Sequence, residues 1–296
     1  MENYCSTISA QAGEALFGTV SQTKFYLLLE YNGSWEEKAL AKSSIPEEVK
    51  QRLTEVSKNL PGSKVLLIKR GSTPPAGPLH FFLAAAGKNF SRLYRFQLNS
   101  YVEILDLDLT AIFQGAPGYQ PYLQSDPLYL VCTNGRRDLC CSRFGFPVYE
   151  ALKKLVGGAA WECTHVGGHR FAANLLHLPQ AVLYGRVQPQ DTAALVEQIQ
   201  SGKMRLENLR GRTVYPEVVQ AADYFLRQQT GELGLEAFQL VEAVEIEPEH
   251  WQVHFRAAKS GEDYNLEVLQ EKGEAKVYES CTLDKQTLVK KYIKVS

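Results

Sequence analysis

The chain has 296 residues, of which 45% are hydrophobic, and its 32 basic and 33 acidic side chains leave a net charge of −1. This length is enough for one large domain or two modest ones with an ample core. The balanced charge gives no electrostatic basis for binding nucleic acid or a membrane, and no apolar run approaches the length of a membrane span. Because the N-terminus lacks a basic segment followed by an apolar one, no secretory signal is expected.

The first segment combines predicted strands with one predicted helix. The strands are expected at residues 25–29, 65–68, 80–83 and 93–98. Ser44 and Glu47 have the spacing of a capping box, and apolar residues then recur at helical spacing until Pro61 and Gly62 stop the helix. This order predicts an N-terminal α/β domain over residues 1–120.

The second segment begins after residues 115–127, a stretch rich in proline, glycine and tyrosine that predicts a linker or surface loop. A buried strand is expected at 128–132, followed by a loop with cysteines and a helix that Pro147 opens and Gly157 ends. Further strands are expected at 161–164 and 182–184, and further helices from 191 to about 201 and from 212 onward. These elements make up the second predicted domain, residues 121–235.

The last segment, residues 236–296, is expected to be β-rich. Within it, apolar and polar side chains alternate over 251–255, which is typical of a half-buried strand. His250 and His254 have a His-x₃-His spacing, but on a strand they would stand about 13 Å apart. They are therefore expected to be surface or structural histidines rather than ligands of one metal.

The residues that point to chemistry lie in two loops of the second domain. The candidate metal ligands are Cys132, Cys140, Cys141, His165 and His169. Gly167 and Gly168 would cost a helix roughly 2 kcal/mol relative to alanine, so a loop that turns both imidazoles toward one centre is favoured. Since the adjacent Cys140 and Cys141 cannot easily both reach that centre, one of them is expected to be a ligand.

Two thiolates and two imidazoles suit two kinds of metal site. Thiolate and imidazole both bind zinc as well as iron–sulfur clusters, and the His-x₃-His spacing is typical of zinc. The separation of Cys132 from Cys141, however, is longer than the spacing in zinc fingers. The spacing therefore leaves a structural Cys₂His₂ zinc site and an iron–sulfur cluster both open.

Three motifs together resemble the sucrase/ferredoxin-like family. They are Cys-Thr-Asn-Gly-Arg-Arg-Asp-Leu-Cys-Cys at 132–141, Thr-His-Val-Gly-Gly-His-Arg-Phe-Ala-Ala-Asn at 164–174 and Leu-Tyr-Gly-Arg at 183–186. The resemblance runs from about residue 128 to residue 186. Asn134 departs from it, since many relatives have histidine there, but this position is not expected to be a ligand.

That family contains thioredoxin-like ferredoxins, some of which are similar to Rieske proteins in carrying a [2Fe–2S] cluster on two cysteines and two histidines. The resemblance implies that Cys132, Cys141, His165 and His169 bind such a cluster, with Cys140 as the alternative to Cys141. It also implies an α/β fold in which residues 121–235 form a thioredoxin-like ferredoxin domain. The β-α-β order of residues 1–120 is compatible with a second thioredoxin-like unit before it.

The function implied by the resemblance is electron transfer, one electron at a time, to a redox partner protein. Replacing two thiolates with imidazoles makes the site less negative, so Rieske-type potentials lie at roughly −150 to +300 mV, against about −400 mV for plant-type ferredoxins. Since imidazole exchanges a proton at its outer nitrogen, the potential is predicted to fall as pH rises. No catalytic acid–base or nucleophile set is evident, so a carrier is favoured over an enzyme.

Two alternatives remain open from the sequence. The first is a non-redox protein whose zinc holds two loops together. The second is a thiol–disulfide oxidoreductase that uses Cys132 or the Cys140-Cys141 pair, although the absence of a C-x-x-C motif weakens it.

Four arginines lie near the motifs: Arg136, Arg137, Arg170 and Arg186. They are either solvated loop charges with Asp138 as a partner, or a basic rim that steers an acidic redox partner or an anionic substrate. The spacing does not choose between these interpretations.

The remaining cysteines and histidines receive structural roles. Six cysteines are too few for a disulfide scaffold, so a reducing compartment, the cytoplasm, is expected. Cys163 is expected to be a buried small hydrophobe and His177 a satisfied core histidine. His80 is given no function, and Cys5 and Cys281 lie near the chain ends, far from the motifs in sequence.

Overall fold

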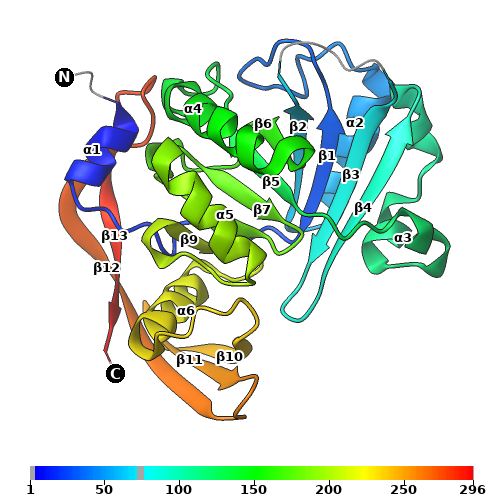
Figure 1. The fold of residues 1–296 in the computed structure, drawn as a ribbon. Helices are drawn as coiled ribbons and strands as arrows, with labels where there is room; N and C mark the ends of the chain where they lie inside the picture. Colours follow the sequence, from blue (N-terminus) through cyan, green and yellow to red (C-terminus); the bar gives the residue numbers. More distant parts are fainter. Residues whose placement is uncertain (1–3, 72–76, 296) are drawn as a thin grey trace.

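Nine strands form one curled sheet that runs through the first two thirds of the chain (Figure 1). The computed structural model describes residues 4–71 and 77–295, so Met1–Asn3, part of the segment predicted to lack a secretory signal, lie outside the described residues. The strands of this sheet are β1 (Phe25–Glu30), β2 (Ser63–Lys69), β3 (Leu79–Ala86), β4 (Ser91–Leu98), β5 (Leu128–Cys132), β6 (Ala160–Cys163), β7 (Leu175–Leu178), β8 (Val182–Tyr184) and β9 (Leu209–Arg212).

The sheet consists of two halves with the same arrangement. In the first half β1 and β2 are parallel, β3 is antiparallel to β1, and β4 is antiparallel to β3. In the second half β5 and β6 are parallel, β7 is antiparallel to β5, and β8 is antiparallel to β7. The halves join where β2 and β6 pair antiparallel, with Ile68 opposite Cys163. This repeated order confirms the predicted α/β class.

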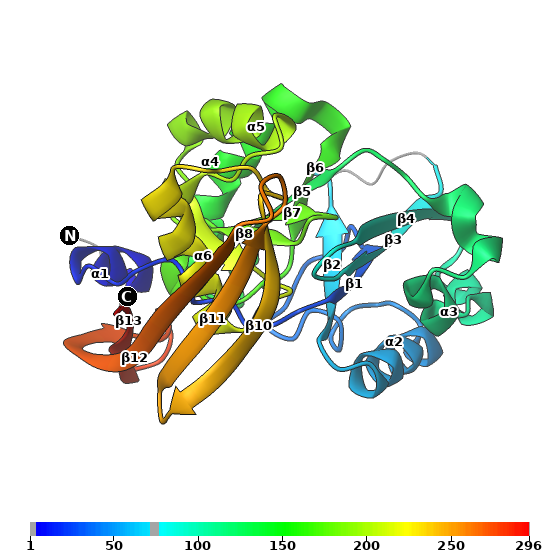
Figure 2. The same cartoon turned by 90° about the horizontal axis from the view of Figure 1, so that it is seen from below.

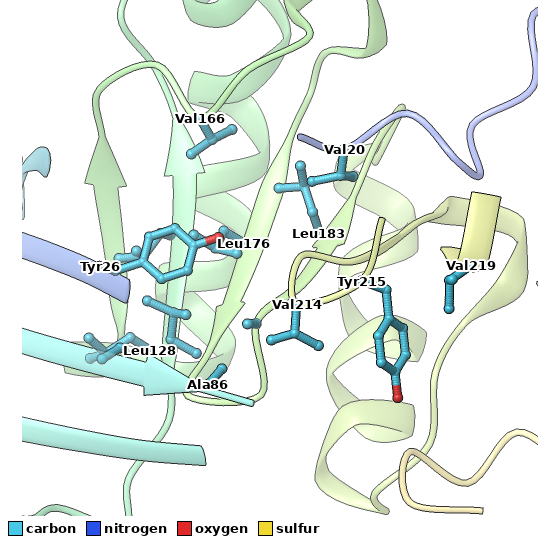
Figure 3. Packing of buried hydrophobic residues seen from close by; sticks show 14 of the residues in the cluster. Val20, Tyr26, Ala86, Leu128, Val166, Leu176, Leu183, Val214, Tyr215 and Val219 are labelled. Atoms are coloured by element: carbon cyan, nitrogen blue, oxygen red, sulfur yellow. The ribbon is translucent and has the colours of Figure 1, made fainter. Parts of the chain in front are cut away.

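Six α-helices accompany the sheet within the described residues. They are α1 (Cys5–Gln11), α2 (Glu47–Asn59), α3 (Leu109–Gln114), α4 (Leu139–Val156), α5 (Thr192–Gln200) and α6 (Glu217–Thr230). One apolar core lies under α2 and α3 in the first half, and another lies under α4 and α5 in the second. A third core is shared, because Tyr26 of β1, Leu128 of β5 and Val219 of α6 belong to one extended cluster of buried side chains, part of which Figure 3 shows.

A second sheet follows at the C-terminus, as expected from the alternating pattern (Figure 2). Its four antiparallel strands are β10 (Phe238–Glu247), β11 (His250–Ala257), β12 (Asp263–Tyr278) and β13 (Gln286–Lys294). Val253 and Phe255 of β11 are fully buried, because this sheet packs on α6. None of the helices in the described residues is long and apolar enough to cross a membrane.

Two of the predicted helix starts were wrong. The N-cap of α2 is Pro46 without a side-chain bond, because Ser44 instead bonds the hydroxyl of Tyr31. Helix α4 begins at Leu139 rather than at Pro147, which lies inside the helix. The start signal is Asp138, whose carboxylate accepts the backbone N–H of Cys140 and so satisfies the first turn.

The stretch predicted as a loop, residues 115–127, contains a short 3₁₀ helix, Pro117–Tyr122. The predicted boundaries at 120 and 235 fall in the connections before β5 and before β10. Because one sheet continues across the first boundary, these divisions stay predictions.

Candidate metal centre

The cysteine loop is built by a close approach of helix α4 to strand β5. A Cβ at Gly145 would lie 2.2 Å from the carbonyl oxygen of Cys132, so only glycine allows this distance. Strand β5 ends at Cys132, and Asp138, the N-cap residue of α4, lies six residues later. This places Cys141, in the first turn of the helix, beside the end of the strand.

Two thiols and one imidazole converge at this point. The ligand atoms of Cys132, Cys141 and His165 all lie within 4.8 Å of one another, and Sγ of Cys141 is 3.9 Å from Nδ1 of His165. Both thiols are buried, whereas His165 is half-buried. Hydrogen bonds with Cys141 and His165 hold the pKa of Cys132 well below its usual range, although burial acts to raise it. The arrangement favours a thiolate at Cys132.

His169 lies beside His165 with one unused ring nitrogen, although it is not among the three residues whose ligand atoms converge. Its ring centroid is 5.0 Å from that of His165, and its Nε2 is hydrogen-bonded to the backbone carbonyl of Glu279. A carbonyl only accepts, so Nε2 carries the proton and Nδ1 has a free lone pair. Nδ1 is buried and has no hydrogen-bond partner in the described part of the chain. Burial also lowers the pKa of His169, which favours the neutral ring that binds metals.

The histidine loop is a loop, as predicted from its glycines, and both of them have positive φ, +110° at Gly167 and +67° at Gly168. Arg210 and Asn174 form hydrogen bonds with the carbonyls of these two glycines. Nη1 of Arg210 donates to the carbonyl of Gly167 and to Oδ1 of Asn174, each at 2.9 Å, and Nδ2 of Asn174 donates to the carbonyl of Gly168 at 3.0 Å. Burial lowers the pKa of Arg210 to about 9.

Arg210 is the functional residue that the sequence reasoning missed. It lies on β9, beyond the motifs, and nothing local marks it as a partner of the loop. Asn174, by contrast, closes the second motif and was within reach of prediction.

The histidines lie toward solvent, each beside a cavity. A cavity of about 470 Å³ is lined by His169 and Glu279 together with Arg136, Arg137 and Arg170; we call it the His169 cavity. A smaller one, of about 230 Å³, is lined by His165, Asn134 and Leu67 among others. The thiols therefore face the core and the imidazoles face outward.

The four arginines near the motifs do not form a single set. Arg137 pairs with Glu37 at 2.8 Å, and Arg170 pairs with Glu14 at 3.0 Å. Arg186 does not line the His169 cavity and instead donates to the hydroxyl of Ser9 at 2.8 Å. Arg136 is exposed and forms no ion pair within residues 4–71 and 77–295.

One interpretation of the sequence made Asp138 a partner of the arginines, but it contacts other residues instead. Its Oδ2 lies 3.7 Å from Nε2 of His169, and it accepts from the hydroxyl of Ser280 and the backbone of Cys281, both at 2.8 Å. Burial acts to raise the pKa of Asp138, but these hydrogen bonds outweigh it and hold the pKa below its usual value.

The other singled-out side chains lie elsewhere. The thiol of Cys140 points away from the Cys132 centre and contacts Cys281, with the two sulfur atoms 3.1 Å apart. Cys163 is fully buried in the shared core, as expected for a small hydrophobe. His177 is a core residue beside Tyr129, but its Nε2 has no partner among the described residues, so it is not the satisfied histidine that was expected.

The two strand histidines and Asn134 have structural partners. Nε2 of His250 lies 3.5 Å from Glu267, and Nε2 of His254 lies 2.7 Å from Asp263. Asn134 donates to the backbone carbonyl of Glu36 at 3.1 Å. It therefore shapes the cysteine loop.

Comparison with known proteins decides the family. The model of a family described as sucrase/ferredoxin-like matches residues 16–211. The chain belongs to the sucrase/ferredoxin-like family. The match includes both motif loops and Arg210, whereas Cys5 and Cys281 lie outside it.

One curated relative also matches part of the chain. Altered inheritance of mitochondria protein 32 of Meyerozyma guilliermondii is 31% identical over 98 residues, which are 29% of this chain and 35% of the relative. The chain thus matches about a third of that protein's length. No solved structure matches the chain.

Proposed function

We propose that this protein is a one-electron carrier whose [2Fe–2S] cluster is bound by Cys132, Cys141, His165 and His169. The observation that carries the proposal is the convergence of two buried thiols and one imidazole, with the ring of His169, whose Nδ1 has no partner in the described residues, 5.0 Å from the ring of His165. The donor set is the one that Rieske-type centres use. Such a cluster supplies a site that takes up and releases a single electron.

The directions of the two adjacent thiols support Cys141, rather than Cys140, as a ligand. Its thiol faces Cys132 and His165, while the thiol of Cys140 faces Cys5 and Cys281. Adjacent residues in the first turn of a helix point in different directions, so one helix sends neighbouring thiols to two places.

The surrounding residues orient the histidines. The backbone carbonyl of Glu279 fixes the tautomer of His169, which leaves Nδ1 as the metal-binding nitrogen. Arg210 and Asn174 fix the carbonyls of Gly167 and Gly168 between the two histidines. Neutral imidazoles at the outer side reduce the negative charge of the site, which favours a higher potential than four thiolates give.

The half-buried histidines are the proposed route of electron exchange. Both rings line cavities open to solvent, and the exposed Arg136 adds positive charge beside His169. This charge favours an acidic redox partner protein over a basic one. All six cysteines are free thiols, which supports the proposal of a reducing compartment, the cytoplasm.

Substitution of the four ligands tests the proposal. Cys132→Ser, Cys141→Ser, His165→Ala and His169→Ala are each expected to remove most of the iron and the visible absorption of the anaerobically purified protein. His250→Ala on β11 is the matched control and is expected to keep both. A colourless wild-type protein that contains zinc would contradict the proposal and support the structural zinc site.

A further inference from the structure

Three cysteines that are far apart in sequence meet at a second place in the fold. They are Cys5 on α1, Cys140 on α4 and Cys281 in the turn between β12 and β13. Sγ of Cys5 is 3.4 Å from Sγ of Cys140 and 3.4 Å from Sγ of Cys281, and the last two sulfurs are 3.1 Å apart. Helix α1 and the turn between β12 and β13, which gave no signal in the sequence, thus come together at the start of α4 (Figure 1).

Two hydrogen-bond donors are directed at sulfur atoms of this group. The hydroxyl of Ser6 donates to Sγ of Cys140 at 3.3 Å, and the backbone N–H of Cys5 donates to Sγ of Cys281 at 3.3 Å. Donors directed at sulfur are the outer contacts that orient and stabilise thiolate ligands in metal sites. Cys5 and Cys140 are fully buried, so negative charge here needs compensation.

Asp138 adds a fourth donor to the set. The ligand atoms of Cys5, Asp138, Cys140 and Cys281 all lie within 4.8 Å of one another, and Oδ1 of Asp138 is 3.9 Å from Sγ of Cys5. A carboxylate has about four acceptor positions. Three are used, by the backbone of Cys140 on Oδ1 and by Ser280 and Cys281 on Oδ2. The fourth, on Oδ1, accepts from the thiol of Cys5 at 3.9 Å, so it becomes free for a metal ion when that thiol loses its proton.

Lysine and arginine side chains do not neutralise this group. Within residues 4–71 and 77–295, neither forms a hydrogen bond or an ion pair with Asp138 or with the three thiols, and the ring of His169, 3.7 Å from Asp138, is the neutral tautomer described above. Three thiols also cannot all be satisfied by a disulfide, since one would always be left over. A bound divalent cation would hold all three sulfurs together and offset half of the charge of three thiolates and one carboxylate.

We propose that Cys5, Cys140, Cys281 and Asp138 bind one zinc ion in a second metal site, distinct from the Cys132 centre. Three sulfurs and one oxygen in a compact group suit zinc, which takes thiolate and carboxylate ligands tetrahedrally, whereas softer copper(I) prefers sulfur alone. Tetrahedral zinc–sulfur bonds of about 2.3 Å separate the sulfurs by about 3.8 Å. The three thiols therefore need to move by only a few tenths of an ångström, and each releases its proton on binding.

The site fastens α1 and the turn between β12 and β13 beside the first centre. Cys281 follows Glu279, whose carbonyl accepts the hydrogen bond of His169, and α1 packs against the 3₁₀ turn His169–Phe171. Two of the three thiols lie outside residues 16–211, the range that the family model matches. The proposed zinc site therefore lies only partly within the region that the family model matches.

Metal analysis of the full-length protein tests the site. Protein produced with added zinc is expected to contain about one zinc per chain at this site, and Cys5→Ser, Cys140→Ser and Cys281→Ser are each expected to lose it. Cys163→Ala is the matched control, because Cys163 is equally buried but belongs to neither group, and it is expected to keep the zinc. If the Cys132 centre also holds zinc, the count falls from two to one in the three variants, so the two proposals are tested separately.

X-ray absorption at the zinc edge covers the case in which a variant does not fold. Wild-type protein with one zinc per chain is expected to show three sulfur neighbours at about 2.3 Å and one oxygen neighbour at about 2.0–2.2 Å. The site is overturned if the wild type contains no zinc, if iron is lost instead of zinc in the three variants, or if Cys281→Ser keeps its zinc. A disulfide between any two of the three cysteines in the purified protein overturns it as well.

Discussion

The two halves of the large sheet place different chemistry at the same point of the same arrangement. Strand β1 ends at Glu30 and strand β5 ends at Cys132. The residues there are Glu-Tyr-Asn-Gly at 30–33 and Cys-Thr-Asn-Gly at 132–135. In the first half Glu30 accepts from the ring of His80 at 2.7 Å, and Arg95 contacts the other ring nitrogen at 2.7 Å. In the second half Cys132 meets other potential metal ligands.

The difference shows what makes one half suitable for a metal. The carboxylate of Glu30 accepts from Nδ1 of His80, and Nε2 of His80 accepts from Arg95, so the strand end in the first half is a hydrogen-bonded chain with a neutral imidazole in the middle. Cys132 instead lies beside Cys141 and His165, which are potential metal ligands like itself. Nδ1 of His169 has no partner in the described residues. The same fold thus supports a structural pair in one half and a candidate metal centre in the other.

The largest expected effect comes from breaking the hydrogen-bonded chain of the first half. Burial acts to raise the pKa of Glu30, but hydrogen bonds from His80 outweigh it and keep the carboxylate charged. Glu30→Ala leaves the backbone N–H and the Nδ1–H of His80 without their charged acceptor, and at about 1.5–3 kcal/mol for each bond we expect a loss of about 3–5 kcal/mol in the free energy of unfolding. Chemical denaturation measures it. The iron content is expected to stay unchanged, and its loss would show that the two halves are not independent.

Acid is expected to destabilise the second half through His177. Burial lowers the pKa of His177 to about 4, from 6.5. Between those two values the unfolded chain binds a proton that the folded chain does not, so the free energy of unfolding falls as pH decreases. The total loss is about 3 kcal/mol. His177→Leu should remove most of this dependence between pH 6.5 and 4, and an unchanged slope would contradict the assignment.

The substitution of Gly168 by alanine tests whether Arg210 supports the histidine loop. Gly168→Ala would place a Cβ 2.4 Å from Nη2 of Arg210, and φ is +67°. We expect a loss of about 2–3 kcal/mol and a partial loss of iron. Gly202→Ala is the control, since Gly202 has φ +70° with nothing within 4 Å, and it should cost about 1 kcal/mol with full iron. Equal effects of the two changes would show that Arg210 does not position the histidine loop.

The smallest effect is expected at the surface beside the histidines. Arg136→Glu reverses an exposed charge at the His169 cavity. Oxidation of the reduced protein by the anion ferricyanide should slow by about 2–5-fold at low ionic strength, and the difference should vanish in high salt. Electron exchange with the cation hexaammineruthenium should become faster. If both reagents respond alike, electrons do not enter near Arg136.

The parts of the site that follow local patterns were predictable from the sequence. Strand β5 and the Gly167-Gly168 loop were predicted because an apolar run and a pair of glycines act on their immediate neighbours. The start of α4 was not, since Pro147 looked like a first-turn residue while the capping carboxylate of Asp138 is the actual signal.

Long-range partners were beyond the sequence. Arg210 reaches the carbonyl of Gly167 across 43 positions, and Cys5 meets Cys281 across 276. Such pairings follow from how sheets and helices stack, and no spacing rule within one segment encodes them. The repeated Asn-Gly after β1 and β5 was a usable signal of the two halves.

The most direct test of the central claim is iron and acid-labile sulfide analysis of anaerobically purified wild-type protein, with electron paramagnetic resonance of the reduced sample. The account expects about two irons and two sulfides per chain, and a signal from one unpaired electron that appears on reduction. Protein with zinc alone at the Cys132 centre, or protein without iron and without a signal on reduction, would contradict it.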